Sequence, residues 1–291
     1  MQGQRIPIQG GIPMDYQFDL VGKIGSMALI RREDQDIDYN IFARLGRELK
    51  PGMIWVTSGA AEIGRLDYIK RTGHELTCDS VDAKTDYAAQ GQTILMNNYR
   101  QFVRPEIGIR QVLVEHNHFN DPMRREHIRR LLTRAAGQGV IPIINYNDPV
   151  SDEEVRKMEL ASRRAEGEDV VECVDNDETA EVVAKLVGAK HLILLTSTDG
   201  IYLDRHDPST LVRLVSGKDI EEVRLKVYEL MSHCSGASRS GANGARAKLA
   251  FALRAVEEGT NVVIGHARYH IGDLLAGRVP CTRLGVGLED A

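Results

Sequence analysis

One stretch of the chain, from Val174 to Tyr202, combines a helix pattern, a buried-strand pattern and two polar turns. It opens with the acidic cluster Asp175–Asp177, and apolar residues then follow at helical spacing up to Gly188. The apolar run Leu192–Leu195 comes next and ends in the polar turn Thr196–Gly200. Small polar residues at the carboxyl end of a buried strand are typical of the ligand crevice in an open α/β sheet. The acidic cluster is compatible with a bound cation, an oriented lysine or a simple helix cap.

The rest of the chain repeats this alternation of short apolar runs and helix patterns. Strands are expected at Leu20–Ile24, Met53–Thr57, Arg110–Val114, Ile141–Ile144, Leu192–Leu195 and Asn261–Ile264. Helices are expected at Tyr39–Leu49, Ala88–Phe102, Arg124–Gly137, Glu178–Gly188, Asp219–His233 and Ala245–Glu258. This order predicts an α/β fold, a three-layer α/β/α sandwich with a largely parallel central sheet.

Composition limits the classes of function. The chain has 291 residues, is 42% hydrophobic and carries a formal net charge of -5, so nothing indicates binding to nucleic acid or to an anionic membrane surface. The four cysteines are far apart in the sequence, which favours free thiols in a reducing compartment. No apolar run approaches the length of a membrane span, and the N-terminus lacks a signal-peptide core. We therefore expect a cytoplasmic protein.

Two segments depart from the alternating pattern. Residues 1–18 are rich in Gly, Pro and Gln and are expected to form an irregular leader before a single domain over residues 19–291. Ser151–Asp169 is dense in charge and poor in large apolar residues. For that segment we expect a solvated flap or mobile excursion, not a core element.

Four turns that follow strands or precede helices contain residues suited to ligand binding. Lysine beside glycine, and glycine at a helix start, allow backbone N–H groups and an ammonium group to converge on phosphate oxygens. Each turn is also compatible with an ordinary strand exit, and the chain lacks a GxxxxGK[ST] phosphate loop. The four turns are Lys23–Ser26, Thr57–Glu62, Asn145–Pro149 and Gly241–Lys248.

Taken together and in order, these motifs resemble those of the amino acid kinase family, and within it those of the glutamate 5-kinases. The resemblance extends over about residues 20–287. It rests on a KxGS-like turn at Lys23–Ser26, an SSGA-like loop at Val56–Ala60, a GQxxLMxxY-like helix at Ala89–Tyr99, a PIINEND-like strand exit at Pro142–Asp148, the DND cluster at Asp175–Asp177, an LLTDxxGLY-like segment at Leu194–Tyr202 and a GTGGMxTK-like loop at Gly241–Lys248.

The resemblance implies a carbamate-kinase-like fold whose residues 19–175 bind the acceptor and whose residues 176–291 bind the nucleotide. It assigns catalysis to Lys23, Lys248 and Asp177. It assigns acceptor binding to Ser58, Gly59, Asn147, Asp148 and Asn176. It assigns nucleotide binding to Gly25, Ser26, Thr196, Ser197, Gly241 and Gly244.

The implied reaction is phosphoryl transfer from ATP to a carboxylate, with L-glutamate as acceptor, γ-glutamyl phosphate as product and proline biosynthesis as the pathway. A carboxylate is already ionised near neutral pH, so the protein needs to align the reactants and neutralise charge and needs no general base. Nucleotide phosphates and water would hold Mg²⁺, so no residue is assigned as a metal ligand. The resemblance also implies a homo-oligomer whose partners are ATP and a small acidic substrate, with no nucleic acid and no membrane.

Several departures from the family pattern leave other functions open. Tyr146 replaces the glutamate of NEND, Ser197 replaces an aspartate, and Asn243 replaces a loop glycine. By this resemblance, we expect the charged segment before Asp175 to be an insertion, and we expect the C-terminal PUA domain that many glutamate 5-kinases carry to be absent. The alternatives are a family member that phosphorylates a phosphonate, phosphate monoester, carbamate or nucleotide, and a catalytically weak relative that binds nucleotide.

Overall fold

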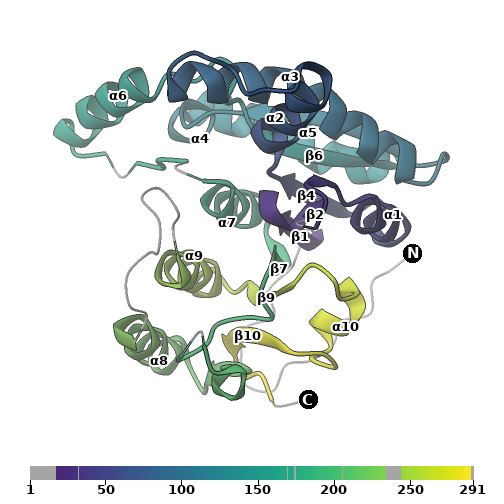
Figure 1. Ribbon diagram of the computed structural model, residues 1–291. Helices are drawn as coiled ribbons and strands as arrows, with labels where there is room; N and C mark the ends of the chain where they lie inside the picture. The colour runs from purple at the N-terminus through teal and green to yellow at the C-terminus, as the bar shows by residue number, and fades with distance from the viewer. Residues whose placement is uncertain are drawn as a thin grey trace.

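The computed structural model describes residues 18–31, 33–168, 170–173, 175–204, 206–233 and 244–289. Its centre is an eight-stranded sheet in the order β5-β6-β4-β1-β7-β9-β10-β8 (Figure 1). The strands are β1 (Phe18–Ile24), β4 (Met53–Thr57), β5 (Gly108–Val114), β6 (Val140–Tyr146), β7 (Ala189–Thr196), β8 (Leu214–Gly217), β9 (Asn261–His266) and β10 (Cys281–Val286). Six strands run parallel, and β8 and β10 run opposite to them. A separate two-stranded hairpin pairs β2 (Ile30–Arg31) with β3 (Asp36–Ile37).

Helices cover both faces of this sheet. Buried apolar side chains on one face pack against α4 (Asn117–Asn120), α5 (Pro122–Gly137), α7 (Asn176–Val187), α8 (Ile220–His233) and α9 (Ala245–Glu257). Those on the other face pack against α1 (Tyr39–Glu48), α2 (Ala60–Thr72), α3 (Ser80–Phe102) and α10 (Ile271–Leu275). The predicted three-layer α/β/α sandwich with a largely parallel sheet is therefore confirmed. None of the helices in the described ranges is both long and apolar enough to cross a membrane.

The centre of the sheet is a switch point of the topology. β1 pairs in parallel with β4 on one side and with β7 on the other. The chain builds β4, β5 and β6 on the first side and returns to β1 with β7 on the second side, as Figure 1 shows. In open α/β sheets, ligands bind beyond the carboxyl ends of the strands at such a point. The turns after β1, β4 and β7 therefore lie where a site is expected.

The segment predicted to be a solvated flap contains a helix, α6 (Glu153–Ala165). Asp152 caps it by accepting a hydrogen bond from the Val155 N–H, and Leu160 is buried. Glu159 contacts His116 at the end of β5, with 2.7 Å between Oε2 and Nε2. Leu160 is the only buried residue in the three turns of α6, so its apolar periodicity is too weak to predict a helix. The exposure of most of the other α6 residues agrees with the high charge density of the segment.

Other differences from the predicted elements lie at ends and edges. Helix α3 begins at Ser80, two turns before the predicted Ala88, because Asp79 accepts hydrogen bonds from the Val81 and Asp82 N–H groups. Strands β8 and β10 and the helices α2, α4 and α10 were not predicted as elements. Phe18 already belongs to β1, and the predicted leader over residues 1–17 lies outside the described residues.

Helices α2 and α3 approach closely at two glycines. A Cβ added at Gly91 would lie 1.9 Å from the Ala60 carbonyl oxygen, and one at Gly64 would lie 1.9 Å from the Tyr87 carbonyl oxygen. Both obstacles are backbone atoms, so a rotamer change cannot remove the overlap. The two glycines thus bring the backbones of α2 and α3 together beside the carboxyl end of β4.

We predict that Gly91→Ala destabilises the fold by at least about 2 kcal/mol, because the helices must separate to admit the methyl group. Urea denaturation measures the free energy of unfolding. Gly137→Ala at the end of α5 is the matched control, since a Cβ added there meets nothing within 4 Å. The control should be neutral or more stable by up to about 1 kcal/mol. Equal stability of the two variants would contradict the close approach.

Helices α7 and α9 enclose a pair of buried carboxyl groups. Glu178 and Glu181 of α7 are each 4% exposed. The guanidinium of Arg254 on α9 lies 3.8 Å from Glu178 Oε1 and 4.0 Å from Glu181 Oε2. Burial raises the pKa of Glu181 from 4.5 to about 7, and Arg254 offsets only part of this effect. The folded protein therefore keeps a proton on Glu181 at a pH where the unfolded chain has lost it.

A raised pKa in the folded state means that the free energy of unfolding falls as pH rises from 4.5 to about 7. We predict that Glu181→Gln stabilises the protein at pH 8, by up to about 3 kcal/mol, and has little effect at pH 4 to 5. Thermal unfolding across pH measures this. The same change at the exposed Glu154 is the control and should leave the pH dependence as it is. A gain in stability for Glu181→Gln that is equal at both ends of this pH range would refute the assignment.

Candidate active site

The side chain of Asp177 lies between two lysines. Its Oδ1 is 2.6 Å from Lys23 Nζ, and its Oδ2 accepts a hydrogen bond from Lys248 Nζ. Lys23 and Asp177 are buried, whereas the Lys248 side chain is 22% exposed. Two ammonium groups and one carboxylate leave this cluster with a net charge of +1. Such a cluster can attract a polyphosphate while each lysine keeps a fixed position.

Three different elements build this cluster. Lys23 is near the carboxyl end of β1, Asp177 is in the first turn of α7, and Lys248 is in the first turn of α9. Asp175 caps α7, because its Oδ1 accepts hydrogen bonds from the N–H groups of Asp177 and Glu178. The DND cluster therefore performs two tasks, with its first residue capping the helix and its third residue pairing the lysines.

The protonation of Asp177 follows from this arrangement. Burial by itself raises the pKa of Asp177, but the charges of Lys23 and Lys248 outweigh it and lower the pKa to about 2. A lowered pKa means that this carboxylate contributes stability above the unfolded value of 3.8, and that the contribution is lost as pH falls toward 2. Asp177 is thus ionised at neutral pH and suited to hold lysines, not to accept a proton.

Glycine turns surround the cluster. Gly25 follows β1, and its N–H donates to the Leu195 carbonyl of β7 at 3.1 Å. Gly59 precedes α2 with a φ of 104°, a conformation that favours glycine. A Cβ added at Gly59 would lie 3.7 Å from Ser26 Cα, so the turns after β1 and β4 touch. Gly59 and Gly244 occupy the cap positions of α2 and α9 without a side chain, which leaves the first-turn N–H groups suited to an anion.

On the other side of the cluster, four polar side chains form a chain of hydrogen bonds, here called the amide relay: Gln92, Asn145, Asn176 and Ser58. Asn145 Nδ2 donates to Gln92 Oε1 at 2.8 Å. Asn176 Nδ2 donates both to Asn145 Oδ1 and to Ser58 Oγ, each at 3.0 Å. The relay runs from α3 across the ends of β6 and β4 to α7, and it joins two predicted acceptor-binding residues to two residues that were not predicted.

A second buried network of hydrogen bonds holds the turn after β4, which contains Ser58. Trp55 Nε1 donates to the Tyr99 hydroxyl at 3.0 Å, which donates to Thr57 Oγ1 at 2.8 Å. Thr57 Oγ1 donates to the Ser58 carbonyl oxygen at 3.1 Å. Burial raises the pKa of Tyr99, so its hydroxyl stays protonated and can donate. Ser58 is therefore held through its carbonyl by one network and through its hydroxyl by the other.

The remaining predicted acceptor residues lie in the turn after β6 and contact other partners. Asn147 Nδ2 donates to Glu115 Oε1 at 2.8 Å. The carboxylate of Asp148 lies 3.4 Å from Lys84 Nζ of α3. The described contacts of Asn147 and Asp148 do not include Ser58 or Asn176. The structure thus places these two residues beside the amide relay without joining them to it.

Tyr146, for which a departure from the family pattern is predicted, contacts the charged segment Ser151–Asp169. Its hydroxyl lies 2.9 Å from Ser151 Oγ, and the guanidinium of Arg156 on α6 lies 6.0 Å from its ring centroid. Arg156 also donates to the Cys173 carbonyl oxygen at 3.4 Å, two residues before Asp175. Ser151 and Arg156 therefore contact both Tyr146 at the end of β6 and the residues that precede α7.

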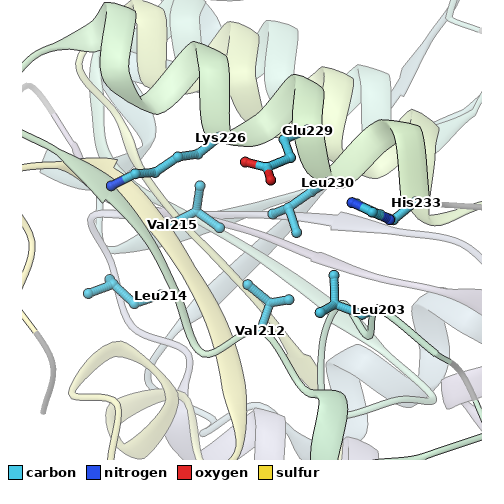
Figure 2. Close-up of a pocket in the computed structure, with 8 residues that line it drawn as sticks. All are labelled: Leu203, Val212, Leu214, Val215, Lys226, Glu229, Leu230 and His233. Atoms are coloured by element: carbon cyan, nitrogen blue, oxygen red, sulfur yellow. The ribbon is translucent and has the colours of Figure 1, made fainter.

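The predicted nucleotide side is more open. Thr196 Oγ1 accepts a hydrogen bond from the Thr198 N–H at 2.9 Å and closes the turn after β7, and Ser197 is exposed. A pocket of about 340 Å³ lies beyond this turn, between α8 and the segment that leads into β8 (Figure 2). Its walls are mostly apolar and include Leu203, Val212 and Leu230. Gly244 starts α9, and Gly241 lies outside the described residues.

The fold is that of an α/β protein, and two lysines and a carboxylate meet at the switch point of its largely parallel sheet. The sequence profile of the amino acid kinase family matches residues 20–266, and the chain belongs to that family. It is 29% identical over 268 residues to a glutamate 5-kinase of Bacteroides thetaiotaomicron, which covers 88% of this chain and 66% of the relative.

Two further comparisons extend this result. A glutamate 5-kinase of Symbiobacterium thermophilum is 35% identical over 182 residues, which covers 62% of this chain and 58% of the relative. The chain thus spans less than two thirds of the length of these relatives. A solved carbamate kinase from Giardia lamblia, bound to AMP-PNP, superposes with a TM-score of 0.59 at 12% identity, over 93% of this chain and 99% of the other. This likeness supports the fold.

We predict that Asp177→Asn lowers the free energy of unfolding by roughly 3 kcal/mol, because it leaves Lys23 buried beside a second ammonium group without a counter-charge. Urea denaturation at neutral pH measures the loss. Asp199→Asn is the matched control, since Asp199 pairs at 2.8 Å with Arg268, whose side chain is 54% exposed. Loss of that surface pair should cost at most about 1 kcal/mol. Equal losses in the two variants would contradict a special role for Asp177.

Proposed function

We propose that this protein is an ATP-dependent kinase that transfers the γ-phosphate to a carboxylate, and that its acceptor is L-glutamate. The observation that carries the proposal is the cluster of Lys23, Asp177 and Lys248. It lies between the amide relay on one side and the turn after β7 on the other. Two fixed ammonium groups at this point suit the charge that spreads over the transferring oxygens.

The proposed reaction needs no general base, because the attacking carboxylate is already ionised near neutral pH. A carboxylate oxygen of the acceptor attacks the γ-phosphorus, the bond to the bridging oxygen of ATP breaks, and ADP leaves with the electron pair. Lys23 and Lys248 would neutralise the charge on the transferring group, and Asp177 would hold both ammonium groups in place. Mg²⁺ would arrive with the nucleotide phosphates and supply further positive charge.

Each side of the cluster suits one substrate. The hydroxyl of Ser58 would bind the reacting end of the acceptor, and Asn176, whose amino group donates to Ser58 Oγ and Asn145 Oδ1, would hold that hydroxyl in place. Asp148 would bind the ammonium group of an amino acid, and its contact with Lys84 supports this because it shows a cation held by that carboxylate. Gly25, Ser26, Thr196 and Gly244 would surround the phosphates of ATP, and the apolar pocket beyond β7 would hold the base (Figure 2).

Tyr146 and helix α6 favour a second candidate within the same chemistry, a kinase for another acceptor. They replace the family glutamate and the usual short link beside the acceptor side. The carbamate kinase with the same fold shows that the family's architecture serves more than one acceptor. A nucleotide-binding protein without turnover is the third candidate, and the paired lysines argue against it. Homo-oligomer formation, a cytoplasmic location, the division into two lobes and a role in proline biosynthesis stay predictions.

We predict that the purified protein, with ATP, Mg²⁺ and L-glutamate, forms a hydroxamate when hydroxylamine traps the acyl phosphate.

Lys248→Ala should lower kcat at least about 100-fold, because it removes one of two charges that stabilise the transition state. Lys70→Ala is the control and should keep kcat, because Lys70 is 53% exposed and pairs with Asp36 at 2.5 Å, outside the cluster and the pocket. If carbamate or a phosphate monoester is turned over and glutamate is not, the assignment of glutamate as acceptor is wrong and the assignment as a kinase stands. Normal kcat in Lys248→Ala would refute the mechanism.

A further inference from the structure

The donor and acceptor atoms of the amide relay are fixed by one backbone group. The Tyr146 N–H donates to Asn145 Oδ1 at 2.9 Å. A backbone N–H can only donate, so the oxygen of Asn145 must face it and the Asn145 amino group must face Gln92. Gln92 meets this amino group with Oε1, and Asn176 meets Asn145 Oδ1 with its own amino group. The orientation of three amides thus follows from the backbone of β6.

This orientation decides the role of the Ser58 hydroxyl. Asn176 donates its Nδ2 to Ser58 Oγ at 3.0 Å, so Ser58 acts as the acceptor in that hydrogen bond. The hydroxyl hydrogen of Ser58 is then left to donate elsewhere. If Asn176 turned over, its Oδ1 would face Ser58 and would take that hydrogen. The direction of the relay therefore determines whether Ser58 can donate to a ligand.

Gln92 is an unusual residue for packing alone. It is 6% exposed, and its Nε2 has no hydrogen-bond partner among the described residues, as is also true of Asn176 Oδ1. An unsatisfied buried amino group costs about 1–3 kcal/mol. An apolar residue of the same length would avoid that cost. What Gln92 adds is a buried acceptor that only the amino group of Asn145 can use.

We propose that Gln92 is a positioning residue for the acceptor: through Asn145 and Asn176 it keeps the Ser58 hydroxyl free to donate to an anionic oxygen of the bound acceptor. The proposal rests on the kinase function above and goes beyond it by stating the substrate chemistry of this position, an anionic oxygen. Gln92 does not contact Ser58, and it acts only through the two asparagines. Gln92 lies on the same face of α3 as Tyr99. Tyr99 donates to Thr57, and Thr57 donates to the Ser58 carbonyl oxygen.

The test replaces Gln92 with methionine, which keeps the length of the side chain and removes the acceptor atom. Asn145 then loses its buried partner, and the amides can turn over. Loss of one charge-assisted hydrogen bond should raise KM for the acceptor on the order of tenfold, while KM for ATP changes less than about twofold. Gln92→Glu is the rescue variant, because its carboxylate can still accept from Asn145, and it should restore most of the acceptor affinity.

A double mutant separates positioning from general loosening of the structure. In a Ser58→Ala background the hydroxyl is absent, so Gln92→Met should raise KM for the acceptor no further. Asn98→Leu is the matched control, since Asn98 is a buried amide of the same helix that donates to the Ile94 carbonyl at 2.9 Å. It should leave KM for the acceptor unchanged. Equal effects of Gln92→Met with and without Ser58, or equal rises in both KM values, would overturn the proposal.

The acceptor used is L-glutamate or, if glutamate is inert, whichever of carbamate and a phosphate monoester is turned over faster. Failure of glutamate therefore removes the glutamate assignment and leaves the positioning role testable. Crystal structures of the protein and of Gln92→Met give a readout that needs no turnover. The variant should lose the contact between Asn176 Nδ2 and Ser58 Oγ or show the Asn176 amide turned over. An unchanged relay in the variant would overturn the proposal whatever the acceptor is.

Discussion

The ion cluster of Lys23, Asp177 and Lys248 is the contact on which the candidate site depends. It joins β1 at the centre of the sheet to the first turns of α7 and α9. Buried ion pairs contribute little net stability, because desolvation of the charges offsets most of their attraction. Their removal is costly, however, since one partner is then left buried and unpaired. The cluster is therefore better explained by the position that it gives two ammonium groups than by stabilisation of the fold.

Position matters here because the two lysines come from parts of the chain that are far apart in sequence. Lys23 belongs to the first strand and Lys248 to the last long helix, and a single carboxylate holds both. A polyphosphate that entered between them would find its counter-charges already in place. Preorganised charge of this kind stabilises a transition state without reorganisation during the reaction. The fold supplies this arrangement through a switch point at β1, where segments from both sides of the sheet end together.

The sequence predicted the six parallel strands and most of the long helices, because buried strands and amphipathic helices leave strong periodic signals. The order of the motifs also predicted that Asp177 and both lysines belong to one site, and the structure brings their side chains into contact, while their catalytic role stays a prediction. The sequence did not predict β8 and β10, because their sequences, LVSG and CTRLGV, contain no continuous apolar run of strand length. It did not predict α6, since a helix with one buried residue has no clear apolar stripe.

The role of Gln92 could not be predicted for a different reason. Gln92 lies in the GQxxLMxxY-like motif of the sequence. In a helix with both polar and apolar residues, however, the periodicity does not tell whether a glutamine is buried or exposed. Only the register of β6 brings the Asn145 amino group to it, and only the first turn of α7 brings Asn176 within reach. Asn147 and Asp148 show the converse, since they were assigned by motif and the structure gives them partners outside the relay. Motif order thus pointed to loops that the structure brings close together, whereas the partners of individual residues follow only from three-dimensional contacts.

The two sides of the ion cluster differ in how firmly they are built, and this difference bears on specificity. The proposed acceptor side is held by two buried networks that converge on Ser58, by the glycine contact of α2 with α3, and by α6 through Tyr146. The described part of the proposed nucleotide side is an exposed turn and an open apolar pocket. A rigid site rejects an acceptor whose groups leave buried donors and acceptors unpaired, whereas an apolar pocket discriminates weakly. If the proposed function holds, the relay and the residues that contact it would select the acceptor, and changes at Tyr146 and α6 would alter specificity more than changes on the proposed nucleotide side.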